Sequence, residues 1–262
     1  MKKILVTGAN GQLGQCFQKI REDFADLRFT FVGSAELDIT NVEAVIDLFS
    51  KGQFDYCING AAFTNVEEAE KHPEKAFLVN AEGIKNIAEA CKRYQTTLIH
   101  ISTDYVFDGE KLEPYTVNDI PNPINAYGRS KLKGEEYIQQ LLNKFFIIRT
   151  SWLYSEFGHN FYKTILKKAT AGETLTITDT ETGCPTNANN VAKYILELVE
   201  NNMKSYGIQH FTDNKAMTWY SFAREILKKN GLDRTTRLVR DNNYCSFAMR
   251  PKNSVLFLSS KK

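Results

Sequence analysis

Short apolar runs of strand length alternate with helix-patterned stretches through residues 1–150 of the 262-residue chain. Each run is bounded by polar or turn-forming residues, as is typical of strands. The runs cover residues 2–7, 28–32, 55–59, 97–102 and 145–150. Because strands that alternate with helices form parallel sheets through crossover connections, the pattern predicts an α/β fold with a doubly wound parallel sheet.

Amphipathic patterns predict helices between these strands. Residues 15–20 are compatible with a helix, and residues 42–50 have an amphipathic pattern after the cap candidate Thr40. A longer pattern over residues 73–94 predicts one long helix. Its expected buried face consists of Ala76, Val79, Ile84, Ile87, Ala88 and Cys91.

Beyond residue 150 the pattern is less regular and is interrupted by glycines and a proline. Residues 207–211 predict a strand that returns to the sheet. We therefore expect residues 1–150, with returning elements near 185–212, to form one domain. Residues 151–262 are expected to form mainly a smaller, interleaved C-terminal lobe that binds the substrate.

The composition is that of an ordinary globular protein. With 33 basic and 31 acidic residues the net charge is +2, so neither nucleic acid nor a membrane surface is expected as a partner. No stretch has the character of a signal peptide or a membrane span. Five cysteines without a Cys-x-x-Cys pair, and four histidines without ligand-like spacing, indicate neither a disulfide framework nor a metal site. The histidines are interpreted as structural or surface residues, and a reducing cytoplasm fits best.

The strand at residues 2–7 leads into a glycine-rich turn and then a helix-compatible stretch. A dinucleotide pyrophosphate needs backbone N–H groups at a helix N-terminus, and side chains must be absent where the chain approaches the phosphates. Gly8, Gly11 and Gly14 meet both needs. Their Gly-x-x-Gly-x-x-Gly spacing indicates the short-chain dehydrogenase variety of a Rossmann-like, NAD(P)-binding domain. The alternative is that the three glycines only form a turn.

Tyr127 and Lys131 are four residues apart, so on a helix they project from one face. A free tyrosine has a pKa near ~10 and is a poor acid at neutral pH until a nearby ammonium stabilises its phenolate. We expect Lys131 to lower the pKa of Tyr127 in this way, which predicts a reductase. The alternative is a chance pair on a solvated helix face, and the glycine-rich turn favours the catalytic interpretation.

Ordered blocks of sequence resemble the dTDP-4-dehydrorhamnose reductase family of extended short-chain dehydrogenases. The blocks span nearly the whole chain. The runs at residues 102–109 and 149–152 are the ones specific to this family. The other blocks are residues 8–14, 37–40, 59–64, 127–131, 185–186 and 250–254.

The resemblance implies reduction of the C4 ketone of dTDP-4-dehydro-L-rhamnose to dTDP-L-rhamnose by hydride from a nicotinamide. Hydride arrival leaves an alkoxide, so a proton donor must lie within about 3 Å of that oxygen. By the resemblance Tyr127 is this donor, and Lys131 lowers its pKa and binds the nicotinamide ribose. Thr103 hydrogen-bonds the same ketone oxygen. For Thr103 the alternative is an ordinary β-branched residue at a strand end.

The resemblance also implies which residues form the cofactor and substrate sites. The cofactor residues are Gly8, Asn10, Gly11, Gln12, Leu13, Gly14, Asp38, Ile39, Ala61, Ala62, Phe63, Thr64, Tyr127 and Lys131. The substrate residues are Thr103, Asp104, Trp152 and Arg250. Trp152 could instead be a core aromatic residue, and Arg250 could instead form a surface ion pair.

Two departures from common patterns bear on specificity. An NAD-selective site usually has an acid at the end of the second strand, where this chain has residues 32–34, Val-Gly-Ser. No acid is present until Glu36 and Asp38, which removes a repulsion against a 2′-phosphate and favours NADPH. No arginine is there to attract that phosphate, so NADH stays open. Residues 178–186 lack the family's usual Asp-Gln pair, and Asn190 stands where Asp is common, which could alter sugar or nucleotide contacts.

The C-terminus and the family's other members leave further alternatives open. Relatives usually continue into another helix beyond Lys262, so we expect that a partner covers apolar surface there or that the chain is a shortened form. A related nucleotide-sugar reductase or epimerase with another sugar would share the motifs. So would a non-catalytic NADP-binding regulatory subunit like that of methionine adenosyltransferase, although the intact Thr103, Tyr127 and Lys131 argue against it. The oligomeric state, including a homodimer, is not fixed.

Overall fold

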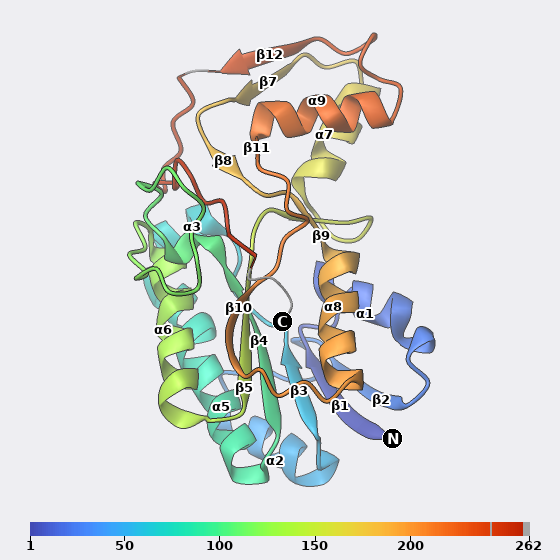
Figure 1. Ribbon diagram of the computed structural model, residues 1–262, viewed down its shortest axis with the longest axis vertical. Coiled ribbons are helices and arrows are strands. Elements are labelled where there is room, and N and C mark those ends of the chain that lie inside the picture. The colour runs from blue at the N-terminus through green and yellow to red at the C-terminus, as the bar shows by residue number, and fades with distance from the viewer. Residues whose placement is uncertain (242, 259–262) are drawn as a thin grey trace.

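The computed structural model describes residues 1–241 and 243–258. At its centre is a six-stranded sheet with the order β10-β5-β4-β3-β1-β2, and every neighbouring pair is parallel (Figure 1). The strands are β1 (Lys2–Thr7), β2 (Leu27–Val32), β3 (Tyr56–Asn59), β4 (Thr97–Thr103), β5 (Phe145–Thr150) and β10 (Gly207–His210). The chain runs outward from β1 to β2 and then crosses to β3 on the other side of β1. This confirms the Rossmann-like, doubly wound α/β fold and places the switch point between β1 and β3.

Helices cover both faces of this sheet because successive strand residues point to opposite sides. Ile4 and Val6 pack in a core beneath α1 (Gln12–Ile20) and α8 (Ala188–Glu200). Leu5, between them, packs in the second core on the other face. That face is covered by α2 (Val42–Gly52), α5 (Gly83–Tyr94) and α6 (Ala126–Leu141).

The predicted strands agree with the observed ones to within a few residues, and the returning strand is β10, which pairs with β5. The expectation of one regular helix over residues 73–94 was wrong. The segment consists of α4 (Pro73–Phe77), a π-helical turn η2 (Leu78–Glu82) and α5. The wider turn carries Asn80, whose amide holds the backbone of Phe63 through two hydrogen bonds of 2.8 and 2.9 Å. π-turns inside helices often mark functional sites.

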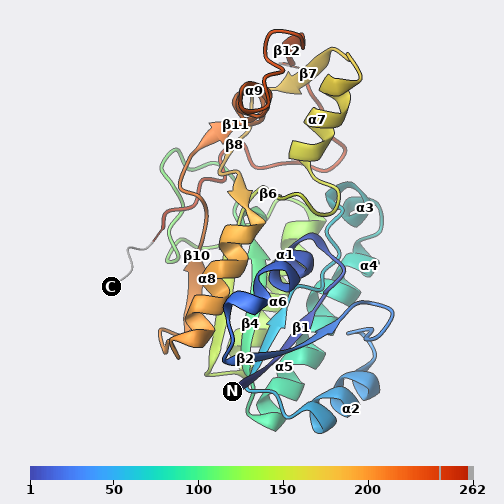
Figure 2. The ribbon, with the colours of Figure 1, turned by 90° about the vertical axis from the view of Figure 1, so that its right-hand side faces the viewer.

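A smaller lobe sits above one end of the sheet in both ribbon views (Figures 1 and 2). Its core includes Ile165, Leu175, Phe222 and Ile226. The elements of this lobe are α7 (Phe161–Thr170), β7 (Leu175–Thr178), β8 (Thr182–Gly183), β11 (Met217–Thr218), α9 (Trp219–Lys229) and β12 (Leu238–Asp241). Between β8 and β11 the chain returns to the main body through α8 and β10, so the two parts are interleaved.

Short elements complete the fold. They are η1 (Arg21–Asp23), α3 (Val66–Lys71), η3 (Asp104–Val106), β6 (Leu153–Tyr154) and β9 (Thr186–Asn187). β6 and β9 pair with each other where the main body meets the lobe. Within residues 1–241 and 243–258, no helix combines the length and apolar character needed to cross a membrane.

Candidate active site

A cleft of about 940 Å³ opens at the carboxyl ends of the sheet strands, the usual ligand position in such folds. Its walls come from the main body and, through Trp219, from the lobe. Every predicted site residue lines it. These residues are Gly8, Asn10, Gly11, Gln12, Leu13, Gly14, Asp38, Ile39, Ala61, Ala62, Phe63, Thr64, Thr103, Asp104, Tyr127, Lys131, Trp152 and Arg250.

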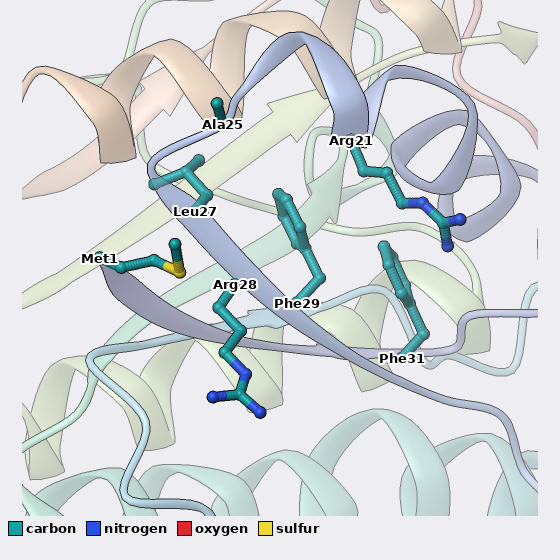
Figure 3. Close-up of a pocket in the computed structure, with 7 residues that line it drawn as sticks. All are labelled: Met1, Arg21, Ala25, Leu27, Arg28, Phe29 and Phe31. Atoms are coloured by element: carbon teal, nitrogen blue, oxygen red, sulfur yellow. The ribbon is translucent and has the colours of Figure 1, made fainter.

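A second hollow, of about 480 Å³, lies along edge strand β2 (Figure 3). It is lined by Met1, Arg21, Ala25, Leu27, Arg28, Phe29 and Phe31. The two hollows have no described lining residue in common. Because this one begins at the amino ends of β1 and β2, its position is the wrong one for a ligand of a parallel sheet. The cleft is therefore the candidate active site.

The glycine-rich turn packs too tightly against neighbouring backbone to accept side chains at Gly8 and Gly14. A Cβ at Gly14 would lie 2.5 Å from the carbonyl oxygens of Gly8 and Ala9, and Gly8 has a φ of +66°. Helix α1 begins immediately after Gly11, which has no side chain to cap the first N–H groups. These free N–H groups and the positive end of the helix dipole suit a pyrophosphate. The residues of this chain thus fit a dinucleotide cofactor.

Tyr127 and Thr103 meet in the middle of the cleft. Tyr127 lies in the first turn of α6, which the side chain of Asn125 caps by accepting from the N–H of Gly128 at 2.8 Å. Thr103 ends β4 and shares a side-chain hydrogen bond with Tyr127. Burial raises the pKa of Tyr127 to about 12, and the Thr103 hydrogen bond opposes this rise.

Lys131 lies one turn beyond Tyr127 on α6 and is buried. Its amine donates to the carbonyl oxygen of Ile101 at 2.7 Å and lies 3.3 Å from Nε2 of His100. Burial lowers the pKa of Lys131 to about 8, and the charge of Glu135 acts in the opposite direction. The pKa of Tyr127 is set here by burial, Thr103 and Asp104, and the role expected of Lys131 in lowering it stays a prediction. Burial dominates the pKa of both groups.

Asp104 is a buried acid that follows Thr103 in the chain and contacts its hydroxyl. The hydroxyl of Thr103 donates to its Oδ1 at 3.1 Å. Burial raises the pKa of Asp104 to about 7, and hydrogen bonds from Ser254 and Thr103 oppose the rise. A carboxyl group with such a pKa is protonated about half of the time at neutral pH, so it can donate as well as accept a hydrogen bond.

Trp152 forms one wall of the cleft together with a residue that the sequence did not indicate. Its indole stacks on that of Trp219, with centroids 3.4 Å apart and an angle of 3°. Trp219 Nε1 donates to Glu181 at 2.9 Å. Trp219 was missed because it lies 67 positions further along the chain, outside every motif. A Cβ at Gly183 would lie 2.5 Å from the Trp152 ring, so Gly183 makes room for the pair.

Arg250 lies in the cleft and also forms an ion pair with Glu67. It lines the cleft, and its Nη2 donates to Oε1 of Glu67 at 3.0 Å. The backbone N–H of Ala248 donates to the other Glu67 oxygen at 3.1 Å. Among the described residues Arg250 Nε has no partner, although it is buried. The guanidinium is thus held by an acid on α3 and keeps donors for an anion.

The end of β2 lies in the cleft beside the predicted adenine side. Gly33 and Ser34 line it next to Asp38 and Ile39. The carboxylate of Glu36 accepts from the backbone N–H of Gly33 at 2.8 Å, so this acid is engaged by its own turn. Where NAD-selective sites have an acid, after the end of the second strand, this cleft is lined by the uncharged Gly33 and Ser34.

Comparison with known proteins identifies the family. The model described as RmlD substrate binding domain matches residues 1–262. The chain belongs to this family. It is 35% identical to a protein of Aggregatibacter actinomycetemcomitans named dTDP-4-dehydrorhamnose reductase, over 99% of this chain and 92% of that protein. It is also 34% identical to a protein of Streptomyces niveus named dTDP-4-keto-6-deoxy-D-glucose reductase, over 96% and 87% of the two chains.

Solved structures of RmlD family members have the same architecture. The crystal structure of dTDP-4-dehydrorhamnose reductase from Bacillus anthracis in complex with NADP is similar, with a TM-score of 0.94 and 33% identity. The match covers 98% of this chain and 91% of that one. The sequence resemblance to this family is thereby confirmed. The roles given to individual residues stay predictions.

Proposed function

We propose that this protein is an NADPH-dependent reductase of the C4 ketone of dTDP-4-dehydro-L-rhamnose, which forms dTDP-L-rhamnose for nucleotide-sugar biosynthesis. The observation that carries the proposal is the convergence of Thr103, Tyr127 and Lys131 in the cleft that also contains the glycine-rich turn. Family membership over the full chain and the names of its relatives support the same activity. NADP in the Bacillus anthracis structure supports NADPH as the cofactor, with NADH as a second option.

Each residue then has a task in the reaction. The hydride that reaches C4 would come from the reduced nicotinamide when NADPH is bound. Thr103 and Tyr127 hold the ketone oxygen, and Tyr127 delivers a proton to it as negative charge develops. Burial makes the phenolate form of Tyr127 unfavourable, as its raised pKa indicates. A protonated Lys131 stabilises that phenolate after Tyr127 has given up its proton.

The remaining residues bind the two ligands. In this proposal the turn at residues 8–14 holds the pyrophosphate of the cofactor, Asp38 and Ile39 flank its adenine, and residues 61–64 line its nicotinamide side. Asp104 and Trp152 contact the sugar nucleotide, and the guanidinium of Arg250 binds its diphosphate.

The two parts of the chain then have separate tasks. Residues 1–150, with returning elements near 185–212, form the NAD(P)-binding domain, and residues 151–262 form mainly the substrate lobe. We place the enzyme in the cytoplasm, where the five free cysteines stay reduced. Its partner is a dTDP-linked 4-keto-6-deoxysugar rather than nucleic acid or a membrane, and a homodimer is compatible with this activity.

Product identification tests the proposal. The purified chain is incubated with NADPH and enzymatically generated dTDP-4-dehydro-L-rhamnose, and the product is identified by NMR against dTDP-L-rhamnose. In parallel, dTDP-4-keto-6-deoxy-D-glucose is offered, because the Streptomyces niveus relative is named for it. Faster turnover of the first sugar supports the proposal. Faster turnover of the second assigns another sugar, and cofactor binding without any turnover assigns a regulatory subunit.

A further inference from the structure

His100 is fully buried on β4, directly beneath the candidate catalytic lysine. Its Nε2 lies 3.3 Å from Nζ of Lys131, and its Nδ1 lies 3.1 Å from Nδ2 of Asn59. Both ring nitrogens therefore have a polar neighbour inside the core. The sequence indicated only a structural or surface histidine, because the contact joins two segments 31 positions apart.

The ring stays neutral in this environment. Burial, followed by the nearby charge of Lys131, holds the pKa of His100 well below its usual value. A neutral imidazole carries one proton, so one nitrogen donates and the other accepts. Which nitrogen donates follows from what its two neighbours offer.

The hydrogen bond that Lys131 can make to His100 depends on the charge of the lysine. An ammonium group has only donors, so beside it Nε2 must accept and the ring proton must sit on Nδ1. A neutral amine has a lone pair, so beside it Nε2 can carry the proton and Nδ1 can accept from Asn59. Turning the Asn59 amide over gives up the 3.2 Å bond from its Nδ2 to the carbonyl oxygen of Ala61. The 2.7 Å contact with the Thr7 hydroxyl is kept, because a hydroxyl both donates and accepts.

We propose that His100 is a positioning residue that changes tautomer as Lys131 gains or loses its proton, so that the hydrogen bond between His100 and Lys131 is kept in both states. In this arrangement the ring proton moves between Nε2 and Nδ1 while the imidazole remains neutral overall. The hydrogen bond to the ammonium is the stronger of the two, because one partner is charged. His100 therefore favours the charged lysine.

Other groups face this pair from the surrounding elements. From α6, Tyr127 lies one turn before Lys131, and Glu135 one turn after it. Arg149 on β5 binds Glu135, with 2.6 Å between Nη2 and Oε2. Together with Asn59 on β3, these groups form the polar surroundings in which Lys131 titrates. The charge of Glu135 favours the ammonium, and Glu135 is itself ion-paired with Arg149.

The first test needs no turnover and so is independent of the proposed reductase activity. Long-range ¹H–¹⁵N spectra of histidine-labelled protein report which ring nitrogen is protonated, and the His100 signals are assigned by their loss in His100→Gln. We expect the two nitrogens to exchange roles with a midpoint near pH 8, the pKa of Lys131. We expect no such exchange in Lys131→Met. One tautomer between pH 6 and 10, or an exchange that persists in Lys131→Met, overturns the proposal.

The second test rests on the proposed function and reads the pH profile of turnover. His100→Leu can neither donate nor accept, so the alkaline limb of kcat/KM should move down by about one pH unit. His100→Gln, which keeps a donor and an acceptor, should retain most of the original limb. Leu98→Val, two residues earlier on the same face of β4, controls for lost packing. A limb that stays in place in His100→Leu, or moves equally in Leu98→Val, contradicts the proposal.

Discussion

Arg149 on β5 binds Glu135 on α6 through two nitrogens, with distances of 2.6 Å from Nη2 to Oε2 and 3.0 Å from Nε to Oε1. Both side chains are buried, and Ser102 also donates to Glu135 at 2.5 Å. The pair ties α6, which carries Tyr127 and Lys131, to the sheet strand that follows it in the chain. The position of the candidate catalytic helix thus depends on a buried ion pair.

Breaking this pair on one side should destabilise the fold. In Arg149→Met the Glu135 carboxylate stays buried without its cation, and we expect a loss of about 3–5 kcal/mol in the free energy of unfolding. Urea unfolding at pH 7 measures it. The double variant Arg149→Met/Glu135→Leu should recover much of the loss, because no buried charge is left alone. A double variant as unstable as Arg149→Met contradicts this account.

The buried Asp104 should make stability depend on pH. Its pKa is about 7 in the folded chain and near 3.8 when unfolded, so the folded state binds more protons between these values. Stability then falls as pH rises from 4 to 7. At pH 8 we expect Asp104→Asn to be more stable than the original chain, by up to about 4 kcal/mol in the free energy of unfolding. At pH 4 we expect the variant to have no such advantage. Urea unfolding at both pH values measures this, and equal differences at both would contradict it.

The tight turn predicts a specific loss of cofactor binding. A Cβ at Gly14 meets backbone atoms at 2.5 Å, so Gly14→Ala must shift α1 relative to the turn. We expect NADPH affinity to fall at least ~10-fold, measured by nicotinamide fluorescence. Gly172→Ala is the control for backbone strain outside the cleft, since its φ of +73° disfavours alanine although no described heavy atom lies within 4 Å of its Cβ position. Affinity that falls equally in both variants would argue against a pyrophosphate site at this turn.

A substitution at Ser34, which follows β2, should change the preference between NADPH and NADH. Ser34→Asp places a carboxylate at the position that holds the ribose 2′-hydroxyl in NAD-selective sites and repels a 2′-phosphate. We expect the ratio of kcat/KM for NADPH to that for NADH to fall by about tenfold or more, equivalent to ~1.4 kcal/mol. Thr30→Asp, exposed on the same edge strand, should leave the ratio unchanged. An unchanged ratio in Ser34→Asp would place the ribose elsewhere.

Local patterns in the sequence were sufficient to predict the sheet and the glycine-rich turn, whereas most of the cleft lining was implied by the resemblance to the family. The glycine-rich turn follows β1 and Thr103 ends β4, and parallel strands bring their carboxyl ends to one edge, so these two parts of the cleft were expected to lie together. Spacing along the chain carries this information directly.

Contacts between segments that are distant in the chain could not be predicted from local patterns. Trp219 against Trp152, His100 against Lys131 and Arg149 with Glu135 arise only when elements pack. The pKa values of Tyr127 and Lys131 were also out of reach, because burial sets them and spacing does not report burial. The π-turn at residues 78–82 was missed for a related reason, since its Asn80 holds a loop on another segment.

The central claim is that Tyr127 donates the proton in an NADPH-dependent reduction within this cleft. The most direct measurement compares turnover of dTDP-4-dehydro-L-rhamnose, followed by NADPH absorbance, in the original chain and in Tyr127→Phe, with NADPH affinity measured for both. We predict a fall in kcat of at least ~100-fold with NADPH affinity nearly unchanged, because one general acid is lost. A Tyr127→Phe variant that turns over at close to the original rate would contradict the account.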